Sequence, residues 1–426
     1  METLNSATEN ISCEAMPLWR PNSNELIIQK SIPHKPKVDP NNPDKFLPAI
    51  GLLSQLCVYN ILTKTEKPLE DSYKPYFLSR CSAKGTYLAA MAAQLSILDE
   101  STNQIKNVSN SVSIWNLSTQ AKIAHFFTHD PSFVISPEEK YIGSSGHETR
   151  NLVIRSMVTG DIIHTFTRRD QHSLAPTPLH SHEIVFSPDD QWVAIEDHGI
   201  IQIQNMDNPT PFPISIEGYM PQFGTHNKLI MRQGTTLLFC DTSNFKSGTF
   251  NIVPYKDLPN FRRDSKFLIS KDCLKVLIPI APHTLNGRYQ RFDCSKLELL
   301  PGTYNIIATS DDFSLFATKT FEETFISSFE ENTLEDRKDG KHYCIKFLLD
   351  HAFFSADNQY LFLENTRTII IWCLKKGIHC FIKTSIPGFP LYKSSCSPDS
   401  THLLVRSSTD QAILIDLRAL TYKSIN

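Results

Sequence analysis

The sequence is poor in the features that mark fibrous, disordered or strongly charged chains. Only 15 of its 426 residues are glycine, whereas 26 are phenylalanine and 13 are tyrosine, so a collagen-like or largely disordered chain is excluded. Lys plus Arg (42) nearly balance Asp plus Glu (45), and the net charge is −3. No overall field therefore draws the chain to nucleic acid or to an anionic membrane. The composition predicts an ordinary globular protein.

Long apolar runs are also missing. No basic stretch followed by an apolar run is present among the first residues, so the sequence predicts no secretory signal. The longest apolar stretch, residues 46–62, is interrupted by Pro48, Ser54, Gln55 and Asn60, which makes it too polar to span a bilayer. We therefore expect a cytoplasmic protein without a membrane span.

The ten cysteines do not form a metal-binding or disulfide pattern. No two of them are spaced as Cys-x-x-Cys, and several fall in segments that we expect to be strands. A reduced thiol in such a position behaves as a small apolar side chain. The pattern predicts reduced, buried cysteines and neither a zinc site nor a disulfide framework. They are Cys13, Cys57, Cys81, Cys240, Cys273, Cys294, Cys344, Cys373, Cys380 and Cys396.

What the sequence does contain is a repeat. A short apolar segment ends in Ser, a turn of Pro, Asp, Glu, Lys or Asn follows, and a second apolar segment begins. The clearest copies start at Phe133, Ile184, Phe353 and Ser394, weaker ones at Leu78, Phe267 and Ile307, a degenerate one at Pro221 and the weakest, a ninth, at Trp19. The eight better copies are anchored by Ser82, Ser136, Ser187, Gly224, Ser270, Ser310, Ser355 and Ser397. Their spacing scatters about the ~40–45 residues of a four-stranded repeat.

Each repeat has the chemistry of a small β-sheet. Ser-Pro-Asp-Asp fits a type I turn, because Pro presets φ at the second position and Asp bonds to its own backbone. The flanking segments are rich in β-branched and aromatic residues, and a third and often a fourth apolar segment follow them. We expect four short antiparallel strands in each repeat. Since one such sheet cannot bury both faces alone, neighbouring sheets must pack together.

These repeats resemble WD40-type repeats. The resemblance rests on the Ser-Pro-Asp turn and on third strands that end in Trp115 and Trp372 before a turn, whereas residues 156–160 and 416–418 occupy the same place without Trp. It covers roughly residues 77–424. No repeat combines a leading Gly-His with a terminal Trp-Asp, and TolB-like and peptidase-associated propellers share the turn. The resemblance implies an all-β fold, a single closed β-propeller of seven or eight four-stranded blades.

The expected organisation has three parts. Residues 1–16 are predicted to be a disordered tail. Residues 17–76 are predicted to form a partial or divergent first blade, or to close the ring, with a Pro-rich insertion at 31–48 that we expect to be an extended loop. Residues 77–426 form the remaining WD40-like blades, interrupted by insertions at 168–182 and 330–341.

The resemblance implies a non-catalytic scaffold that binds other proteins or peptides through its rim loops and channel mouth. Aromatic and Arg side chains contribute much of the energy at protein interfaces, and we expect the 168–182 insertion to be a contact. Each of these residues could equally pack on its own blade. The candidate partner-binding residues are Arg168, Arg169, His172, Tyr219, Tyr255, Phe261, Arg262, Arg263, Phe389 and Tyr392.

Two alternatives stay open. The first is a propeller hydrolase or lyase with its site at the channel mouth, although no nucleophile elbow, P-loop or HExxH motif is present. His180 and His182 could share one face of a strand and bind a metal, or belong to a solvated loop. The second is phosphoinositide binding through residues 261–264, which resemble a Phe-Arg-Arg-Gly motif, but Asp264 replaces Gly and would repel phosphate. We predict no catalytic residue, no cofactor and no metal.

Overall fold

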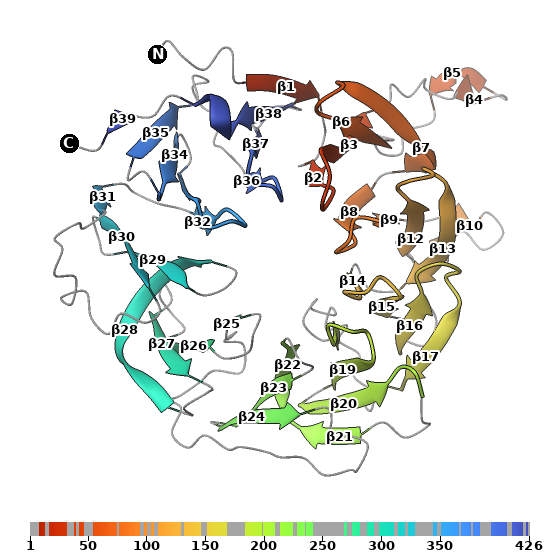
Figure 1. Ribbon diagram of the computed structural model, residues 1–426. Helices are drawn as coiled ribbons and strands as arrows, with labels where there is room; N and C mark the ends of the chain where they lie inside the picture. The colour runs from red at the N-terminus through yellow and green to blue at the C-terminus, as the bar shows by residue number, and fades with distance from the viewer. Residues whose placement is uncertain are drawn as a thin grey trace. The chain divides into compact units, whose positions relative to one another are not determined.

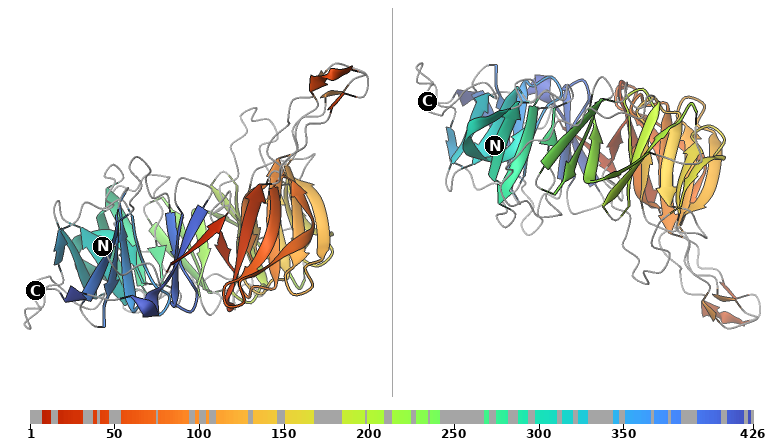
Figure 2. Two further views of the ribbon diagram at one scale, coloured as in Figure 1. Left: turned by 90° about the horizontal axis from the view of Figure 1, so that it is seen from above. Right: turned by 90° about the horizontal axis from the view of Figure 1, so that it is seen from below.

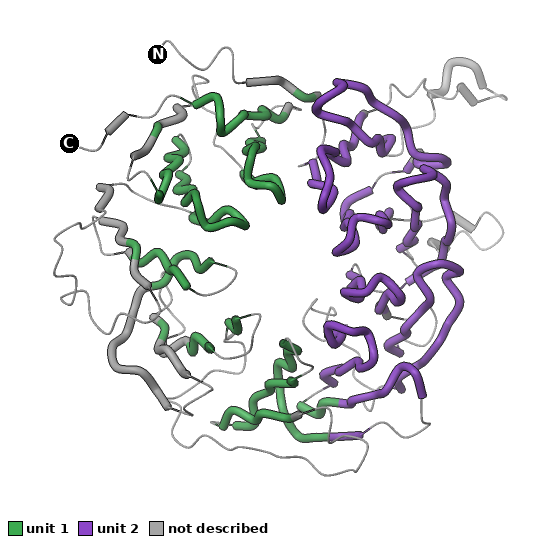
Figure 3. Tube along the Cα trace, in the orientation of Figure 1, with its two compact units in different colours: residues 1–11, 199–201, 216–426 green, residues 12–198, 202–215 purple. Residues whose placement is uncertain are grey.

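The fold was obtained as a computed structural model of the whole chain. It divides into two compact units, unit 1 (residues 1–11, 199–201 and 216–426) and unit 2 (residues 12–198 and 202–215) (Figure 3). The residues that the structure describes are 8–12, 17–31, 38–39, 42–46, 54–74, 76–93, 98–99, 104–105, 110–128, 132–145, 151–167, 184–197, 199–208, 214–224, 228–234, 236–241, 268–270, 275–281, 288–293, 298–310, 314–319, 323–328, 344–346, 351–365, 368–375, 378–383, 393–406, 411–420 and 423–424.

Unit 2 is built from four-stranded antiparallel sheets (Figure 1). Side views show its strands, coloured from red to yellow, running alongside one another (Figure 2). The first sheet contains β2 (Leu18–Trp19), β3 (Glu25–Ser31), β6 (Ser54–Asn60) and β7 (Thr65–Lys74). The second contains β8 (Tyr76–Cys81), β9 (Tyr87–Ala93), β12 (Asn110–Asn116) and β13 (Lys122–Thr128).

Two further sheets repeat this order. The third contains β14 (Phe133–Ile135), β15 (Tyr141–Ser145), β16 (Leu152–Ser156) and β17 (Ile162–Phe166). The fourth contains β18 (Ile184–Phe186), β19 (Trp192–Asp197), β20 (Ile200–Asn205) and β21 (Ile214–Glu217). In each sheet the strands pair in chain order, so the last strand lies at the outer edge.

Unit 1 holds the remaining large sheets, whereas the short strands β10 (Leu98–Asp99) and β11 (Gln104–Ile105) pair with each other in unit 2. β22 (Tyr219–Phe223), β23 (Lys228–Gln233) and β24 (Thr236–Asp241) form a three-stranded sheet. β32 (His351–Phe354), β33 (Tyr360–Glu364), β34 (Thr368–Cys373), β35 (Ile378–Lys383) and the C-terminal β39 (Lys423–Ser424) form a five-stranded one. The last sheet contains β36 (Lys393–Cys396), β37 (His402–Arg406) and β38 (Gln411–Asp416), with the short helix η3 (Leu417–Ala419) after it.

A seven-stranded sheet completes unit 1 and is two repeats joined by one strand. It contains β25 (Leu268–Ile269), β26 (Lys275–Ala281), β27 (Arg288–Asp293), β28 (Glu298–Thr309), β29 (Leu315–Lys319), β30 (Glu323–Ser328) and β31 (Cys344–Lys346). The first part of β28 pairs with β27 and its last residues pair with β29, so β28 ends one repeat and begins the next.

The described residues therefore form nine repeat sheets, one for each copy of the sequence motif. This exceeds the seven or eight blades expected from the eight better copies. The reason is that the weakest copy, at Trp19, also forms a complete four-stranded sheet, in which Trp19 pairs with Leu26 across the first hairpin. The strand segments predicted for all nine copies are confirmed.

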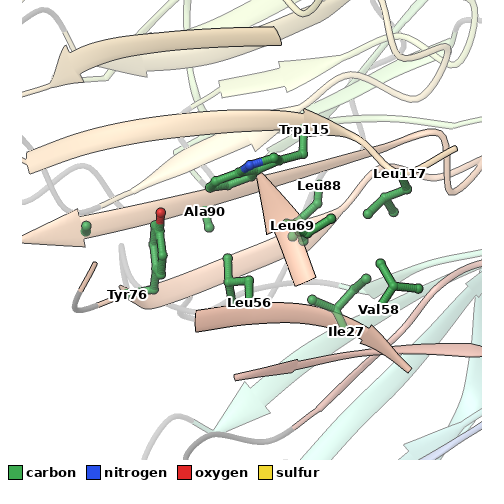
Figure 4. Packing of buried hydrophobic residues seen from close by; sticks show 10 residues of the cluster. Ile27, Leu56, Val58, Leu69, Tyr76, Leu88, Ala90, Trp115 and Leu117 are labelled. Carbon is green, nitrogen blue, oxygen red and sulfur yellow. The ribbon is translucent and has the colours of Figure 1, made fainter. Parts of the chain in front are cut away.

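The core of unit 2 lies between successive sheets. Ile27, Leu56 and Leu88, from the first two sheets, pack in one buried cluster (Figure 4). Trp115 is fully buried in it, with its ring edge-on to Tyr76 at 5.8 Å between centroids and its indole N–H donated to the carbonyl oxygen of Glu70 (2.6 Å). Similar clusters join the second sheet to the third and the third to the fourth. Each sheet thus buries on its neighbours the face that it cannot cover alone.

Two sequence predictions are corrected by the strand pairing. Within residues 1–16, predicted to be a disordered tail, the structure contains strand β1 (Thr8–Ser12), which pairs with β38 and completes the C-terminal sheet. The strand that completes the C-terminal sheet therefore comes from residues 8–12 and not from residues 17–76. The 31–48 insertion, expected to be an extended loop, contains a hairpin of β4 (Val38–Asp39) and β5 (Asn42–Phe46), because Pro43 is tolerated in an edge strand.

Candidate functional site

The motif serine makes the same two hydrogen bonds in every well-formed turn. In the turn at Ser136, the serine N–H is donated to the carbonyl oxygen of Tyr141 (2.9 Å), and the N–H of Tyr141 is donated back to Ser136 Oγ (2.9 Å). A serine is small enough to be buried here and still accept this bond. The same pair of bonds is made by Ser82, Ser187, Ser270, Ser310, Ser355 and Ser397.

The fourth residue of several turns adopts a left-handed backbone conformation. This residue is Gly85 (φ 76°) in the second sheet, Glu139 (φ 66°) in the third and Asp190 (φ 60°) in the fourth. Such a conformation costs a non-glycine residue about 1–2 kcal/mol. At Glu139 and Asp190 that cost is offset by bonds that the side chain makes to the preceding turn.

Asp190 joins the third and fourth sheets of unit 2. Its carboxylate is fully buried and accepts hydrogen bonds from Ser136 Oγ (2.5 Å), from the N–H of Glu138 (3.0 Å) and from the N–H of Lys140 (3.2 Å). All three donors belong to the turn of the preceding sheet. Because a buried carboxylate is stable only when it is well hydrogen bonded, Asp190 fixes the two turns relative to each other.

Glu139 repeats this arrangement one sheet earlier. Its carboxylate accepts the N–H of Lys84 (2.7 Å) and the N–H of Thr86 (3.4 Å) in the turn of the second sheet. Burial alone would raise the pKa of the Glu139 carboxyl, but hydrogen bonds from Ser82, Thr86 and Lys84 outweigh it and hold the pKa below its ordinary value. The carboxylate therefore stays ionised and links the second and third sheets.

The linked turns of unit 2 carry a row of exposed, mostly polar residues. We call it the serine-turn rim and define it by the exposed turn residues Ala83, Lys84, Glu138, Lys140 and Gln191. Lys84 and Glu138 form an ion pair across two turns (2.5 Å). Buried serines and carboxylates hold the turn backbone by hydrogen bonds, so the exposed side chains are carried by a rigid backbone.

A polar cavity of about 350 Å³ adjoins this rim, between the first two turns of unit 2. Arg20 lies in its wall and takes the place of the motif serine, donating Nε to the carbonyl oxygen of Gly85 (2.7 Å) and Nη1 to Glu25 (2.5 Å). Gly85 is required there, because a Cβ would lie 2.6 Å from the carbonyl oxygen of Pro21. Leu62, exposed at the cavity edge, is its largest apolar side chain.

Comparison with known proteins rests on the fold, since no family model and no curated protein matches this sequence. The crystal structure of the eukaryotic initiation factor is similar, with a TM-score of 0.61 and 14% identity over 87% of this chain and 94% of that one. The C-terminal WD40 domain of Sif2 is similar over 98% of this chain and 99% of that one, with a TM-score of 0.50 and 11% identity. The fold is a WD40-type β-propeller. The expected all-β, WD40-like propeller fold is thereby confirmed.

Of the predicted partner-binding residues, the structure describes only Tyr219. It lies in strand β22 and not in a loop, half-buried, and its hydroxyl would be 2.5 Å from a Cβ placed on Gly199. Tyr219 therefore packs closely on its own part of the propeller. The other predicted residues lie outside the described residues: Arg168, Arg169, His172, Tyr255, Phe261, Arg262, Arg263, Phe389 and Tyr392.

Six cysteines in the described strands are free thiols: Cys57, Cys81, Cys240, Cys373, Cys380 and Cys396. Burial raises the pKa of Cys57, Cys81 and Cys396 to about 12, so these thiols stay protonated and unreactive near neutral pH. Within the described residues, no three His, Cys, Asp or Glu side chains converge as a metal site would require. His180 and His182 lie outside that part of the chain. No helix in the described part is long and apolar enough to cross a bilayer.

Proposed function

We propose that this propeller is a non-catalytic scaffold that holds other proteins or peptides on its serine-turn rim. The proposal is supported above all by the buried links from Glu139 and Asp190, which hold successive turns in fixed relation. Fixed, exposed charges of both signs favour a specific partner of complementary charge. WD40-type propellers are used in this way far more often than as enzymes.

The partner to test first is a component of the translation machinery. The motive is the similarity to the eukaryotic initiation factor, which covers most of both chains. At 14% identity that similarity supports a common fold, and the shared role is our proposal. We further propose a cytoplasmic location, consistent with the reduced thiols of the described strands.

The test is recovery of partners on the tagged full-length chain, with mass spectrometry and co-sedimentation with ribosomes as readouts. A variant with Lys84→Glu and Lys140→Glu reverses two rim charges. We expect the amount of partner recovered on this variant to fall about tenfold. The matched control, Lys67→Glu with Lys375→Glu, changes two exposed lysines outside the rim and should bind normally. Equal recovery by both variants would contradict the use of the rim. Removal of residues 169–181 separately tests the predicted contact of the 168–182 insertion.

A further inference from the structure

The outer strands of the sheets differ in how their open edges are protected. β7 contains five charged residues and Pro68, β13 begins with Lys122, and β21 ends with Glu217. Charged residues and Pro on an edge strand discourage another strand from pairing with it. β17, with the sequence Ile-Ile-His-Thr-Phe, has neither a charged residue nor Pro.

β35 is an outer strand with a single charged residue, and the chain covers its outer edge. Its sequence is Ile-His-Cys-Phe-Ile-Lys, with Lys383 at the very end. β39 pairs antiparallel with it, placing Lys423 opposite His379 and Ser424 opposite Ile378. Within the part of the chain that the structure describes, β17 is the last strand of its sheet and no strand pairs with its outer edge. Among the described strands, β35 thus has a covered outer edge and β17 an open one.

Apolar side chains are exposed beside the open edge of β17. Val158 and Ile162 are each 55% exposed and Ile163 is 41% exposed, in contrast to Phe166, which is buried in the core. Water-exposed apolar groups next to unpaired backbone N–H and C=O groups are the two elements that strand addition uses. Backbone bonds supply affinity, and the side chains supply contact area.

The start of β17 is held in place by the sheet beside it. Arg155 donates Nη1 to the carbonyl oxygen of Gly160 (3.2 Å), and its guanidinium lies 4.7 Å from the centre of the Phe126 ring. A Cβ on Gly160, whose φ is 76°, would lie 3.2 Å from the Cβ of Ala124. The edge is thus presented by a fixed turn, which lowers the entropy that a binding partner loses.

We propose that the outer edge of β17 binds a short extended peptide segment of a partner protein by antiparallel strand addition. A five-residue strand is about 17 Å long, so this edge falls well short of the ~800 Å² per partner that a stable dimer needs. That size fits a peptide and not a second copy of the chain. Exposed Asp161 precedes the strand, and an antiparallel peptide places its C-terminal end there. The segment therefore has a Lys or Arg near its C-terminal end, and β-branched residues would favour its extended conformation.

This inference names a partner class for the proposed scaffold and rests on that function, but its test is independent of the rim. The probe is a fluorescent synthetic peptide, Ser-Val-Thr-Ile-Thr-Val-Lys, titrated onto the full-length chain and followed by anisotropy. The control peptide has Pro in place of its central Ile, which removes a backbone donor. We expect the first peptide to bind at least tenfold more tightly, and to protect the amides of residues 162–166 from hydrogen exchange.

Two protein variants locate the binding. Ile163→Lys places a charge on the edge and should weaken binding about tenfold. Leu62→Lys changes a more exposed apolar residue in the turn after β6 and should leave binding unchanged. Removal of residues 421–426 uncovers β35 and should raise the binding ratio from one peptide per chain to two.

Three results would overturn the proposal. These are equal binding of the two peptides, unchanged binding by Ile163→Lys, and protection of amides elsewhere than in β17. Concentration-dependent dimerisation that Ile163→Lys abolishes would assign the edge to a second copy instead. Normal partner recovery by the rim variant would contradict the rim proposal, and tight peptide binding that Ile163→Lys weakens would still support this inference, so the two proposals fail separately.

Discussion

The turn end and the outer edge of the sheets are built by opposite rules. At the turn end, seven serines make the same two bonds, each with a donated N–H 2.9 Å from the serine Oγ. At the outer edge, β7 is charged, β35 is covered by β39 and β17 is open. The repeated serine turns hold the propeller together. The outer edges differ from sheet to sheet, so a single edge can take on a function of its own.

The hydrogen bonds that link neighbouring turns are stronger at Asp190 in unit 2 than at Ser400 in unit 1. In unit 2 the Asp190 carboxylate accepts three hydrogen bonds from the preceding turn. In unit 1 the corresponding residue is Ser400 (φ 57°), whose Oγ accepts only a long bond from the N–H of Asp357 (3.4 Å). A charged acceptor with three donors is worth more than one neutral bond at the limit of hydrogen-bond distance.

The largest expected effect comes from breaking the strong link. Asp190→Gly removes the carboxylate while keeping a residue that tolerates the left-handed backbone, and it leaves the buried Ser136 hydroxyl and two partly buried backbone N–H groups without their acceptor. We expect a loss of about 3 kcal/mol in the free energy of unfolding, against about 1 kcal/mol for Ser400→Gly. Chemical denaturation followed by tryptophan fluorescence measures both. Asp207→Asn, at an exposed aspartate, is the control, and equal losses for Asp190→Gly and Ser400→Gly would refute the difference between the links.

The second-largest effect is a difference in stability loss between two motif serines, Ser136 and Ser355, that look alike in sequence. Ser136 accepts the N–H of Tyr141 and also donates to Asp190 of the next sheet, whereas Ser355 donates to Asp357 within its own turn (2.6 Å). Ser136→Ala should cost about 2 kcal/mol and Ser355→Ala about 1 kcal/mol. Thermal unfolding of the two variants checks the order, and a reversed order would show that the link between sheets adds nothing.

The third effect depends on pH, through Glu139. Its pKa is held below the ordinary value of 4.5, so the ionised form is favoured by the folded state. Its contribution to stability is fully present above pH 4.5 and is lost as the pH falls through the lower, folded-state pKa. Glu139→Gln should therefore be less stable than wild type at pH 7, with the gap closing under acid. Denaturation series between pH 7 and pH 3 test this, and a gap that widens on acidification would be the contrary result.

The smallest effect is expected at the outer edge. Ile163→Lys changes a partly exposed residue that the core does not need, so the free energy of unfolding should move by less than about 0.5 kcal/mol. The same variant is expected to weaken peptide binding, which would separate function at the edge from stability at the turns. A loss of stability as large as that of Asp190→Gly would make Ile163 a structural residue.

Much of the fold could be predicted from the sequence because its signals are local. Alternating apolar residues and the Ser-Pro-Asp turn locate the strand segments of the nine copies, including that at Trp19. The candidate site was harder to predict. An acidic fourth residue in the turns, at Glu139 and Asp190, was the available signal, but Tyr219 was expected in a loop and lies in a strand packed on Gly199. Whether a residue lies in a loop depends on where the strand begins, and the beginning of a strand is set by the strands that pair with it.

The sequence by itself determined the strands, the turns and the repeat, because these follow from the side-chain period and the backbone preferences of a few adjacent residues. Only the tertiary structure decided which groups meet. Asp190 reaches Ser136 across 54 residues of chain, β1 joins β38 from the opposite end of the sequence, and β39 covers β35 but not β17. Such contacts depend on how whole sheets pack and pair, which no short segment of the chain encodes.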